Sequence, residues 1–169
     1  ITDGDLFGYQ ENTTCIDNVW GFAEKTEYHF SAFVKDSAAN WSDSSLNACD
    51  SVKIPDLTPP SNVTDASSVA LSDSTIMVSW TPPTTSDIDS MMIRYRTDGT
   101  YPVDTGDGTL GGMAPITVGA DTLTGLSEKT IYYIGLFVRD SAGLWSSADT
   151  GAQVEAETHD GTVPENVTD

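Results

Sequence analysis

The chain has 169 residues, of which 26 are acidic and 7 are basic, so its formal net charge is −19 at pH 7. This balance excludes nucleic-acid binding, because contacts to phosphate need clustered Lys and Arg side chains. The sequence contains no run of about 18 apolar residues, so no segment is expected to span a membrane.

Short runs that alternate apolar and polar residues, bounded by Pro, Gly, Asp and Asn, predict strands rather than helices. In chain order the runs are 74–80, 91–96, 130–138 and 152–158. Successive side chains of a strand point to opposite faces, so each run has one face for a core. The side chains expected to point inward are Ile76, Val78, Trp80, Met91, Ile93, Tyr95, Tyr132, Ile134, Leu136 and Val138.

The segments between these runs carry residues that are typical of turns. Two prolines follow Trp80, and they cannot continue a central strand because proline lacks the N–H that a ladder needs. Asp-Gly pairs in 97–100 and 106–109 suit tight hairpins, and Asp-Ser-Ala-Gly at 140–143 predicts a further turn. Short strands at this spacing, in about 100 residues, predict a sandwich of two sheets.

Residues 1–65 recur without a gap at 105–169, and 26 of the 65 positions are identical. A period of this length predicts tandem copies of one domain. We expect the C-terminal part of one copy at 1–57, a complete copy at 58–161 and the start of a further copy at 162–169. The missing strands of the first copy would come from an upstream part of the same polypeptide or from another chain.

The complete copy resembles a fibronectin type III domain. The resemblance rests on Pro60, Trp80, Tyr95 and the run Leu-Ser-Glu-Lys-Thr-Ile-Tyr at 126–132, and the first copy has a similar run at 22–28. It is similar to the repeats of bacterial and archaeal extracellular proteins. The resemblance implies an all-β, immunoglobulin-like sandwich of seven strands in two sheets.

The resemblance also implies structural roles for particular side chains. Leu126 and Tyr132 match the tyrosine corner of the family, and Tyr28 matches it in the first copy. A buried corner tyrosine needs a partner for its hydroxyl, so we expect Tyr132 and Tyr28 each to bond the preceding connection. Trp145 follows the turn at 140–143 and recurs as Trp41, so we expect structural roles there also.

No catalytic or cofactor-binding residue can be assigned. The two histidines, His29 and His159, have no serine, cysteine or carboxylate placed near them by a known motif. The sequence contains no CxxC motif. We therefore predict a protein that is not an enzyme and that needs no cofactor.

Cys15 and Cys49 are the only cysteines, and their counterparts in the second copy are glycine and glutamine. A pair gained together in one copy predicts a local disulfide, which would imply an oxidising, extracellular location. Two reduced thiols are the alternative.

Four asparagines, Asn12, Asn40, Asn62 and Asn166, each begin an Asn-X-Ser/Thr sequon without proline. We expect exposed positions for Asn40, Asn62 and Asn166, as glycan attachment requires. The alternative is chance, because a chain rich in Ser and Thr forms such sequons often.

Three acidic residues, Asp98, Asp104 and Asp107, crowd one connection, and oxygen-rich loops of this kind can hold calcium. No EF-hand spacing is present, and Asp-Gly pairs are ordinary in turns. Calcium is therefore a weak hypothesis beside plain turn chemistry.

An aromatic strip is expected on the outward face of the strand 130–139, formed by Tyr133 and Phe137 with Arg139 and Trp145. Arginine over an aromatic ring gives cation–π contacts. The strip would be a docking surface for a neighbouring chain or a self-contained ladder that caps the sheet.

Together these features predict a non-catalytic extracellular repeat module. It would serve as a spacer or building block of a cell-surface stalk, sheath or filament, and it could be adhesive. Its partners would be neighbouring repeats of the same chain, other copies in a filament or other surface proteins. An accessory module of a secreted enzyme, such as a polysaccharide hydrolase, is the alternative, and a specific receptor module is a third possibility.

Overall fold

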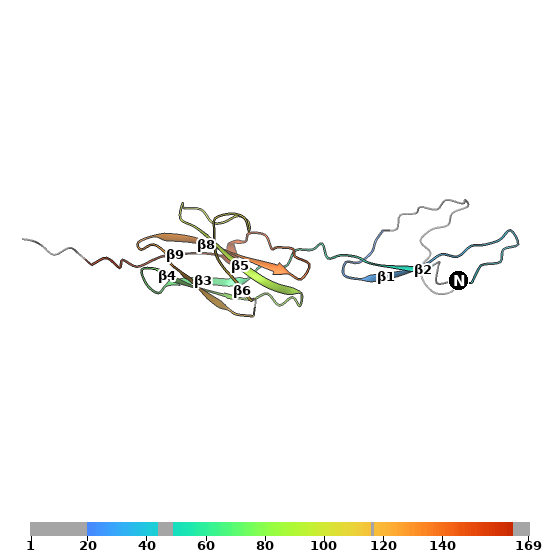
Figure 1. Cartoon of the computed structure of the whole chain (residues 1–169), viewed down its shortest axis with the longest axis horizontal. Coiled ribbons are helices and arrows are strands. Elements are labelled where there is room, and N and C mark those ends of the chain that lie inside the picture. The colour runs from blue at the N-terminus through green and yellow to red at the C-terminus, as the bar shows by residue number, and fades with distance from the viewer. Residues whose placement is uncertain (1–19, 44–48, 116, 164–169) are drawn as a thin grey trace, which may run out of the picture. The chain divides into compact units, whose positions relative to one another are not determined.

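The computed structural model describes residues 20–43, 49–115 and 117–163, and these residues form strands without any α-helix. The chain divides into two compact units, Ile1–Asp56 and Leu57–Asp169 (Figure 1). No helix in the described ranges is long and apolar enough to cross a membrane.

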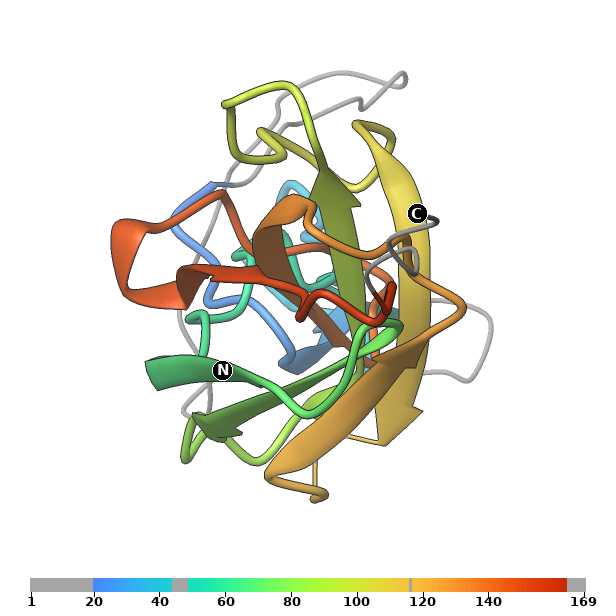
Figure 2. The same ribbon diagram turned by 90° about the vertical axis from the view of Figure 1, so that its left-hand side faces the viewer.

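Unit 2 is a sandwich of a three-stranded and a four-stranded antiparallel sheet, seen along its length in Figure 2. The strand orders are β3-β4-β7 and β6-β5-β8-β9. The bounds are β3 Thr64–Ala70, β4 Thr75–Thr81, β5 Ile88–Arg96, β6 Thr109–Pro115, β7 Ala120–Thr124, β8 Ile131–Asp140 and β9 Gln153–Glu157, with a 3-10 turn η2 at Thr150–Ala152. The prediction of an all-β sandwich with seven strands in this unit is confirmed.

The core of unit 2 lies between the two sheets, and the alternation read from the sequence is confirmed there. Ile76 and Val78 of β4 face Ile93 of β5 and Ile134 of β8 in one buried cluster. Tyr95, which was expected in the core, is only partly buried and packs against the edge of the cluster. Burial of this apolar surface is the main favourable term for folding the unit.

The connection 97–108 between β5 and β6 differs from the tight hairpins that its two Asp-Gly pairs predicted. Gly99 and Gly108 do have positive φ angles, of 89° and 74°. However, both lie in one long connection, and its Pro102 is fully buried. The pairs therefore shape a loop that packs on the molecule instead of two short hairpins.

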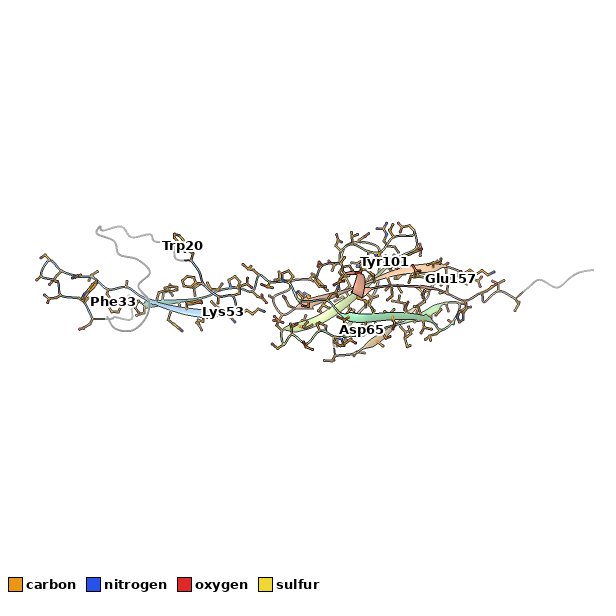
Figure 3. The ribbon with its side chains drawn as sticks, turned by 180° about the vertical axis from the view of Figure 1, so that it is seen from behind. Trp20, Phe33, Lys53, Asp65, Tyr101 and Glu157 are labelled. Atoms are coloured by element: carbon orange, nitrogen blue, oxygen red, sulfur yellow. The ribbon has the colours of Figure 1, made fainter. Side chains whose placement is uncertain are left out.

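In the described part of unit 1, β1 (Glu27–Ser31) and β2 (Cys49–Lys53) form an antiparallel pair. Phe22 packs on Tyr28 with ring centroids 4.4 Å apart and on Phe30 with centroids 5.7 Å apart. Trp20 and Phe33 are exposed in this unit (Figure 3).

Candidate functional site

The corner tyrosines make the hydrogen bonds that the sequence predicted. The hydroxyl of Tyr132 accepts a bond from the Ser127 N–H at 2.8 Å, and the hydroxyl of Tyr28 accepts one from the Ala23 N–H at 2.9 Å. The Tyr132 ring is buried and meets Tyr95 edge to face, with centroids 5.3 Å apart. Each tyrosine therefore ties its strand to the connection that precedes the strand.

We expect Tyr132→Phe to lower the free energy of unfolding of unit 2 by about 1–2 kcal/mol, because it leaves the Ser127 N–H without its partner. Denaturant unfolding followed by tryptophan fluorescence measures the change. Tyr133→Phe is the control, since the Tyr133 hydroxyl makes no hydrogen bond with the described residues, and it should be nearly neutral. Equal stability of Tyr132→Phe and the parent would contradict a corner role.

A network of hydrogen bonds holds the turn 139–146 at the end of β8. The Asp140 N–H donates to the Leu144 carbonyl at 3.0 Å, and the Gly143 N–H donates to the Asp140 carbonyl at 3.1 Å. One carboxylate oxygen of Asp140 accepts from the Leu144 N–H at 2.8 Å. Gly143 has a φ of 90°, which favours glycine. The residues Asp-Ser-Ala-Gly therefore form the turn that the sequence predicted.

The same bonds recur in unit 1 at the turn 35–42. The Asp36 N–H donates to the Asn40 carbonyl at 2.9 Å, and the Ala39 N–H donates to the Asp36 carbonyl at 3.1 Å. The Asn40 N–H donates to the Asp36 carboxylate at 2.8 Å. Ala39 takes the glycine position with a φ of 71°. The two turns, 104 residues apart, therefore have one backbone design.

Each turn also carries a cation above a tryptophan ring. The Arg139 Cζ lies 5.8 Å from the centre of the Trp145 ring, and the Lys35 Nζ lies 5.3 Å from the centre of the Trp41 ring. Arg139 also pairs with Asp89 at 3.6 Å. These contacts hold the tryptophans against their own units, which supports structural roles for both.

One difference between the turns concerns the second carboxylate oxygen of the aspartate. In unit 1 the Asn40 side chain donates to Asp36 Oδ2 at 3.0 Å, and this bond is the main cause that lowers the Asp36 pKa. In unit 2 Leu144 replaces the asparagine. Asp140 is only 1% exposed, and its Oδ2 has no hydrogen-bond partner.

Leu144→Asn should therefore stabilise unit 2 by about 1 kcal/mol, because a new donor would reach a buried acceptor that lacks a partner. Leu144→Ala is the control and should destabilise, since it removes apolar contact and supplies no donor. The substitution creates an Asn-Trp-Ser sequon, so the protein must be made in a host without N-glycosylation. A melting temperature for Leu144→Asn at or below that of Leu144→Ala would contradict the expectation.

Phe137 lies on the outer face of β8, as the sequence predicted, but it is only 1% exposed, so of the two readings the open docking surface is wrong at this position. Phe137 and Pro102 both lie next to Gly135, where an added Cβ would be 3.4 Å from each of them. Tyr101 meets Tyr133 edge to face at 5.3 Å. The connection 97–108 thus covers the outer face of β8, and the face is not open for docking at Phe137.

Tyr101, labelled in Figure 3, fastens this connection to β9. Its hydroxyl lies 3.2 Å from a carboxylate oxygen of Glu155. Burial, with a smaller contribution from the Glu155 charge, raises the Tyr101 pKa. The tyrosine therefore stays protonated and keeps donating this bond at neutral pH.

The carboxylates suggested for calcium form ion pairs and hydrogen bonds within the protein. Arg96 forms ion pairs with both Asp98 and Asp107. The hydrogen bond between Arg96 and Asp98 is the main cause that lowers the Asp98 pKa and raises the Arg96 pKa. Asp104 Oδ1 accepts from the Gly106 N–H at 2.7 Å. In the described parts of the chain, no three His, Cys, Asp or Glu side chains are grouped so that they could hold a metal ion.

The sequons differ in what their asparagines do. The Asn62 amide nitrogen donates to the carbonyls of Leu136 at 2.9 Å and Ser147 at 3.1 Å, so it ties the start of unit 2 to the sandwich. A glycan on that nitrogen would disturb these bonds. Asn40 is exposed, and its glycosylation stays a prediction, while Asn12 and Asn166 lie outside the described residues.

The predicted disulfide also stays a prediction, because Cys15 lies outside the described residues. Cys49 begins β2 and is exposed. Its sulfur lies 3.2 Å from the Ser31 hydroxyl oxygen.

The histidines are far apart in the chain and have different surroundings. His29 is exposed on β1, and His159 bonds through its backbone N–H to the Ser72 carbonyl at 3.0 Å. No described nucleophile or carboxylate is hydrogen-bonded to either imidazole.

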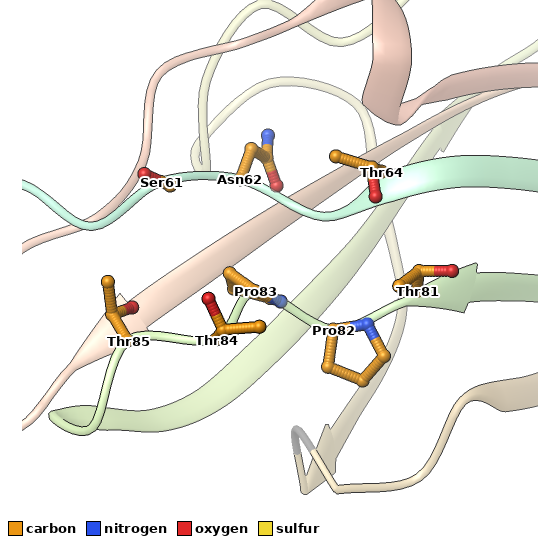
Figure 4. Close-up of a pocket in the computed structure, with 8 residues that line it drawn as sticks. All are labelled: Ser61, Asn62, Thr64, Thr81, Pro82, Pro83, Thr84 and Thr85. Carbon is orange, nitrogen blue, oxygen red and sulfur yellow. The ribbon is translucent and has the colours of Figure 1, made fainter.

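A pocket of about 280 Å³ lies at the start of the sandwich (Figure 4). Its lining comes from two segments, with hydroxyl side chains, two prolines and one amide: Ser61, Asn62, Thr64, Thr81, Pro82, Pro83, Thr84 and Thr85. It has no charged or imidazole group for acid–base chemistry. We assign it no ligand.

Comparison with known proteins gives one family and one fold. The sequence model described as fibronectin type III domain matches residues 58–151. The fn3 domain of human contactin 1 is similar at 20% identity and a TM-score of 0.54, covering 64% of this chain and 86% of that one. No curated protein matches the chain.

Two multidomain structures are also similar in fold. The chicken CNTN1 FN1-FN3 domains have 20% identity and a TM-score of 0.56, and 82% of this chain covers 44% of that one. Domains d3-d4 of the rat CD45 extracellular region have 14% identity and a TM-score of 0.50, and 93% of this chain covers 77% of that one. The chain therefore spans under half the length of the contactin array. At these identities the likeness concerns the fold alone.

Proposed function

Since the chain belongs to the fibronectin type III family, whose domains are typically non-catalytic modules and mostly extracellular, we propose that it is a structural spacer. In this proposal it is a building block of an extracellular stalk, sheath or filament. Residues 1–57 are the C-terminal part of one module, 58–161 a complete module, and 162–169 the start of another.

One observation carries the proposal. The corner bond and the turn after it occur in both units at a spacing of 104 residues, with the same donors and acceptors. Hydrogen bonds that recur at a fixed spacing stabilise the same fold in each module, as is typical of tandem arrays. The acidic surface would keep such an array soluble.

The linkers would limit bending between modules. Pro59 and Pro60 precede Asn62, and proline restricts the backbone to a narrow range of φ. Extended Pro-containing linkers act as semi-rigid spacers. The proposal therefore expects a defined distance between neighbouring modules, with lateral contacts to other copies made at sheet edges.

The test is to isolate the native protein with an antibody raised against residues 58–161, and to determine its full sequence and its location. Many further copies at the same spacing, with labelling at the outside of intact cells, would support the spacer. A hydrolase domain in the same polypeptide would instead favour the accessory module. A cytoplasmic protein with a single copy would overturn both.

A further inference from the structure

The chain that leaves unit 2 after β9 stays attached to the module. The Thr158 N–H donates to the Thr130 carbonyl at 3.1 Å, and the Thr158 hydroxyl donates to the Ser127 carbonyl at 2.6 Å. The Lys129 N–H donates to the His159 carbonyl at 3.3 Å. These bonds continue the sheet contacts past the end of β9 at Glu157.

Side chains of the corner extend this attachment by three residues. The Lys129 Nζ lies 2.6 Å from an Asp160 carboxylate oxygen. One Glu128 oxygen accepts from the Gly161 N–H at 2.8 Å, and the other accepts from the Thr162 hydroxyl. Two adjacent residues of the corner thus bind three successive residues of the exit segment.

The exit segment also contacts the opposite sheet. The His159 N–H donates to the Ser72 carbonyl, in the turn between β3 and β4. A Cβ at Gly161 would lie 2.1 Å from Asp73 Oδ2 and 2.8 Å from Asp73 Cβ, so the segment passes directly against that turn. The exit is therefore held between both sheets of the sandwich.

The ion pair of this arrangement recurs in unit 1. The Lys25 Nζ lies 2.9 Å from Asp56 Oδ2, and the Asp56 side chain is only 8% exposed. Lys25 and Lys129 both have positive φ angles, of 61° and 50°, which is unusual for a residue other than glycine. Leucine stands at residue 57, the counterpart of Gly161.

We propose that Glu128 and Lys129 form an exit clamp, which holds Asp160–Thr162 against the corner of their own module. Bending between modules then begins after Thr162 instead of after β9. Exposed ion pairs contribute weakly one at a time, so the clamp depends on several contacts acting on one short segment. The inference deepens the proposed spacer function and rests on it, because a clamp matters where the chain continues into another module.

The exit clamp predicts a local change in Glu128→Ala within the full chain. Amide hydrogen exchange of Gly161 should become about tenfold faster, because Gly161 loses its acceptor. Exchange of Thr162 should change less, because its N–H donates to Asp160 Oδ1 at 3.0 Å and only its hydroxyl loses a partner. Glu157→Ala is the matched control: it removes an equal charge from an exposed position at the end of β9 and should leave both amides unchanged. The melting temperature of both variants should stay within about 3 °C of the parent, since the clamp lies outside the core.

Exchange at Gly161 that is already unprotected in the parent, or unchanged by Glu128→Ala in a folded protein, would overturn the clamp. If Glu128→Ala unfolds the protein, Glu128→Gln is tested instead. It keeps one weaker acceptor, so its Gly161 exchange rate should be above that of the parent but below a tenfold increase.

The equivalent pair in unit 1 gives an independent readout. Lys25→Ala should widen the distribution of distances between spin labels placed in the two units, while Lys53→Ala, on the exposed β2, should not. An equal width for Lys25→Ala and Lys53→Ala would contradict a recurring clamp. A broad distance distribution in the parent would mean that the two units move independently. That result would contradict the rigid spacer, while exchange at Gly161 would still test the exit clamp.

Discussion

Phe137→Ala should lower the free energy of unfolding of unit 2 by about 3–5 kcal/mol, as expected for deleting a buried aromatic ring. The ring is 1% exposed, and both the ring and Pro102 lie next to Gly135 of β8. Its loss would leave a cavity that a fixed strand and a proline cannot easily fill. Denaturant unfolding with a constant m-value measures the change.

The matched control is Phe33→Ala, at the equivalent position of unit 1. Phe33 is 36% exposed, so its removal should cost clearly less in a like measurement of unit 1. A cost below about 1 kcal/mol for Phe137→Ala would mean that the ring is in solvent. The outward aromatic strip would then be restored as a docking surface.

Gly108→Ala should be nearly as damaging, at about 2–4 kcal/mol, for two reasons that add. The φ of 74° is unfavourable for a residue with a Cβ. The Cβ would also lie 2.5 Å from the Tyr95 carbonyl oxygen and 2.8 Å from Arg96 Cγ. The carbonyl belongs to β5 and cannot move without shifting the strand, so the overlap must be relieved by distortion.

Gly99→Ala separates the two causes. Gly99 has a φ of 89°, but an added Cβ would meet nothing within 4 Å. It should therefore cost only about 1–2 kcal/mol, from backbone strain alone. Equal effects of the two substitutions would mean that the close approach of Gly108 to β5 does not exist.

The inward faces of the central strands could be predicted from the sequence, because alternation with a period of two is a local property. Ile76, Ile93 and Ile134 are buried for this reason. The corner could be predicted also, since Tyr132 and the Ser127 N–H that donates to its hydroxyl are only five residues apart. The repeat carried the same inference to Tyr28.

The same alternation did not reveal that Phe137 is buried. It places the ring correctly on the outer face of β8, but it contains no information about what covers that face. The covering connection is more than 25 residues away in the chain, and its Asp-Gly pairs indicated short hairpins. The sequence signal of a packed loop was the pair Tyr101 and Pro102. It is a weak signal, because a proline in a loop is usually exposed.

The sequence by itself determined the strand faces, the turn at 140–143 and the spacing of 104 residues, because each can be read from residues along the chain. Only the tertiary structure decided the partners of the charged side chains. Arg96 takes Asp98 and Asp107, and Lys129 takes Asp160, although the chain offers many other carboxylates. The reason is physical: ion pairs form between groups that folding brings within a few ångströms, and an excess of acidic residues leaves that choice open in the sequence.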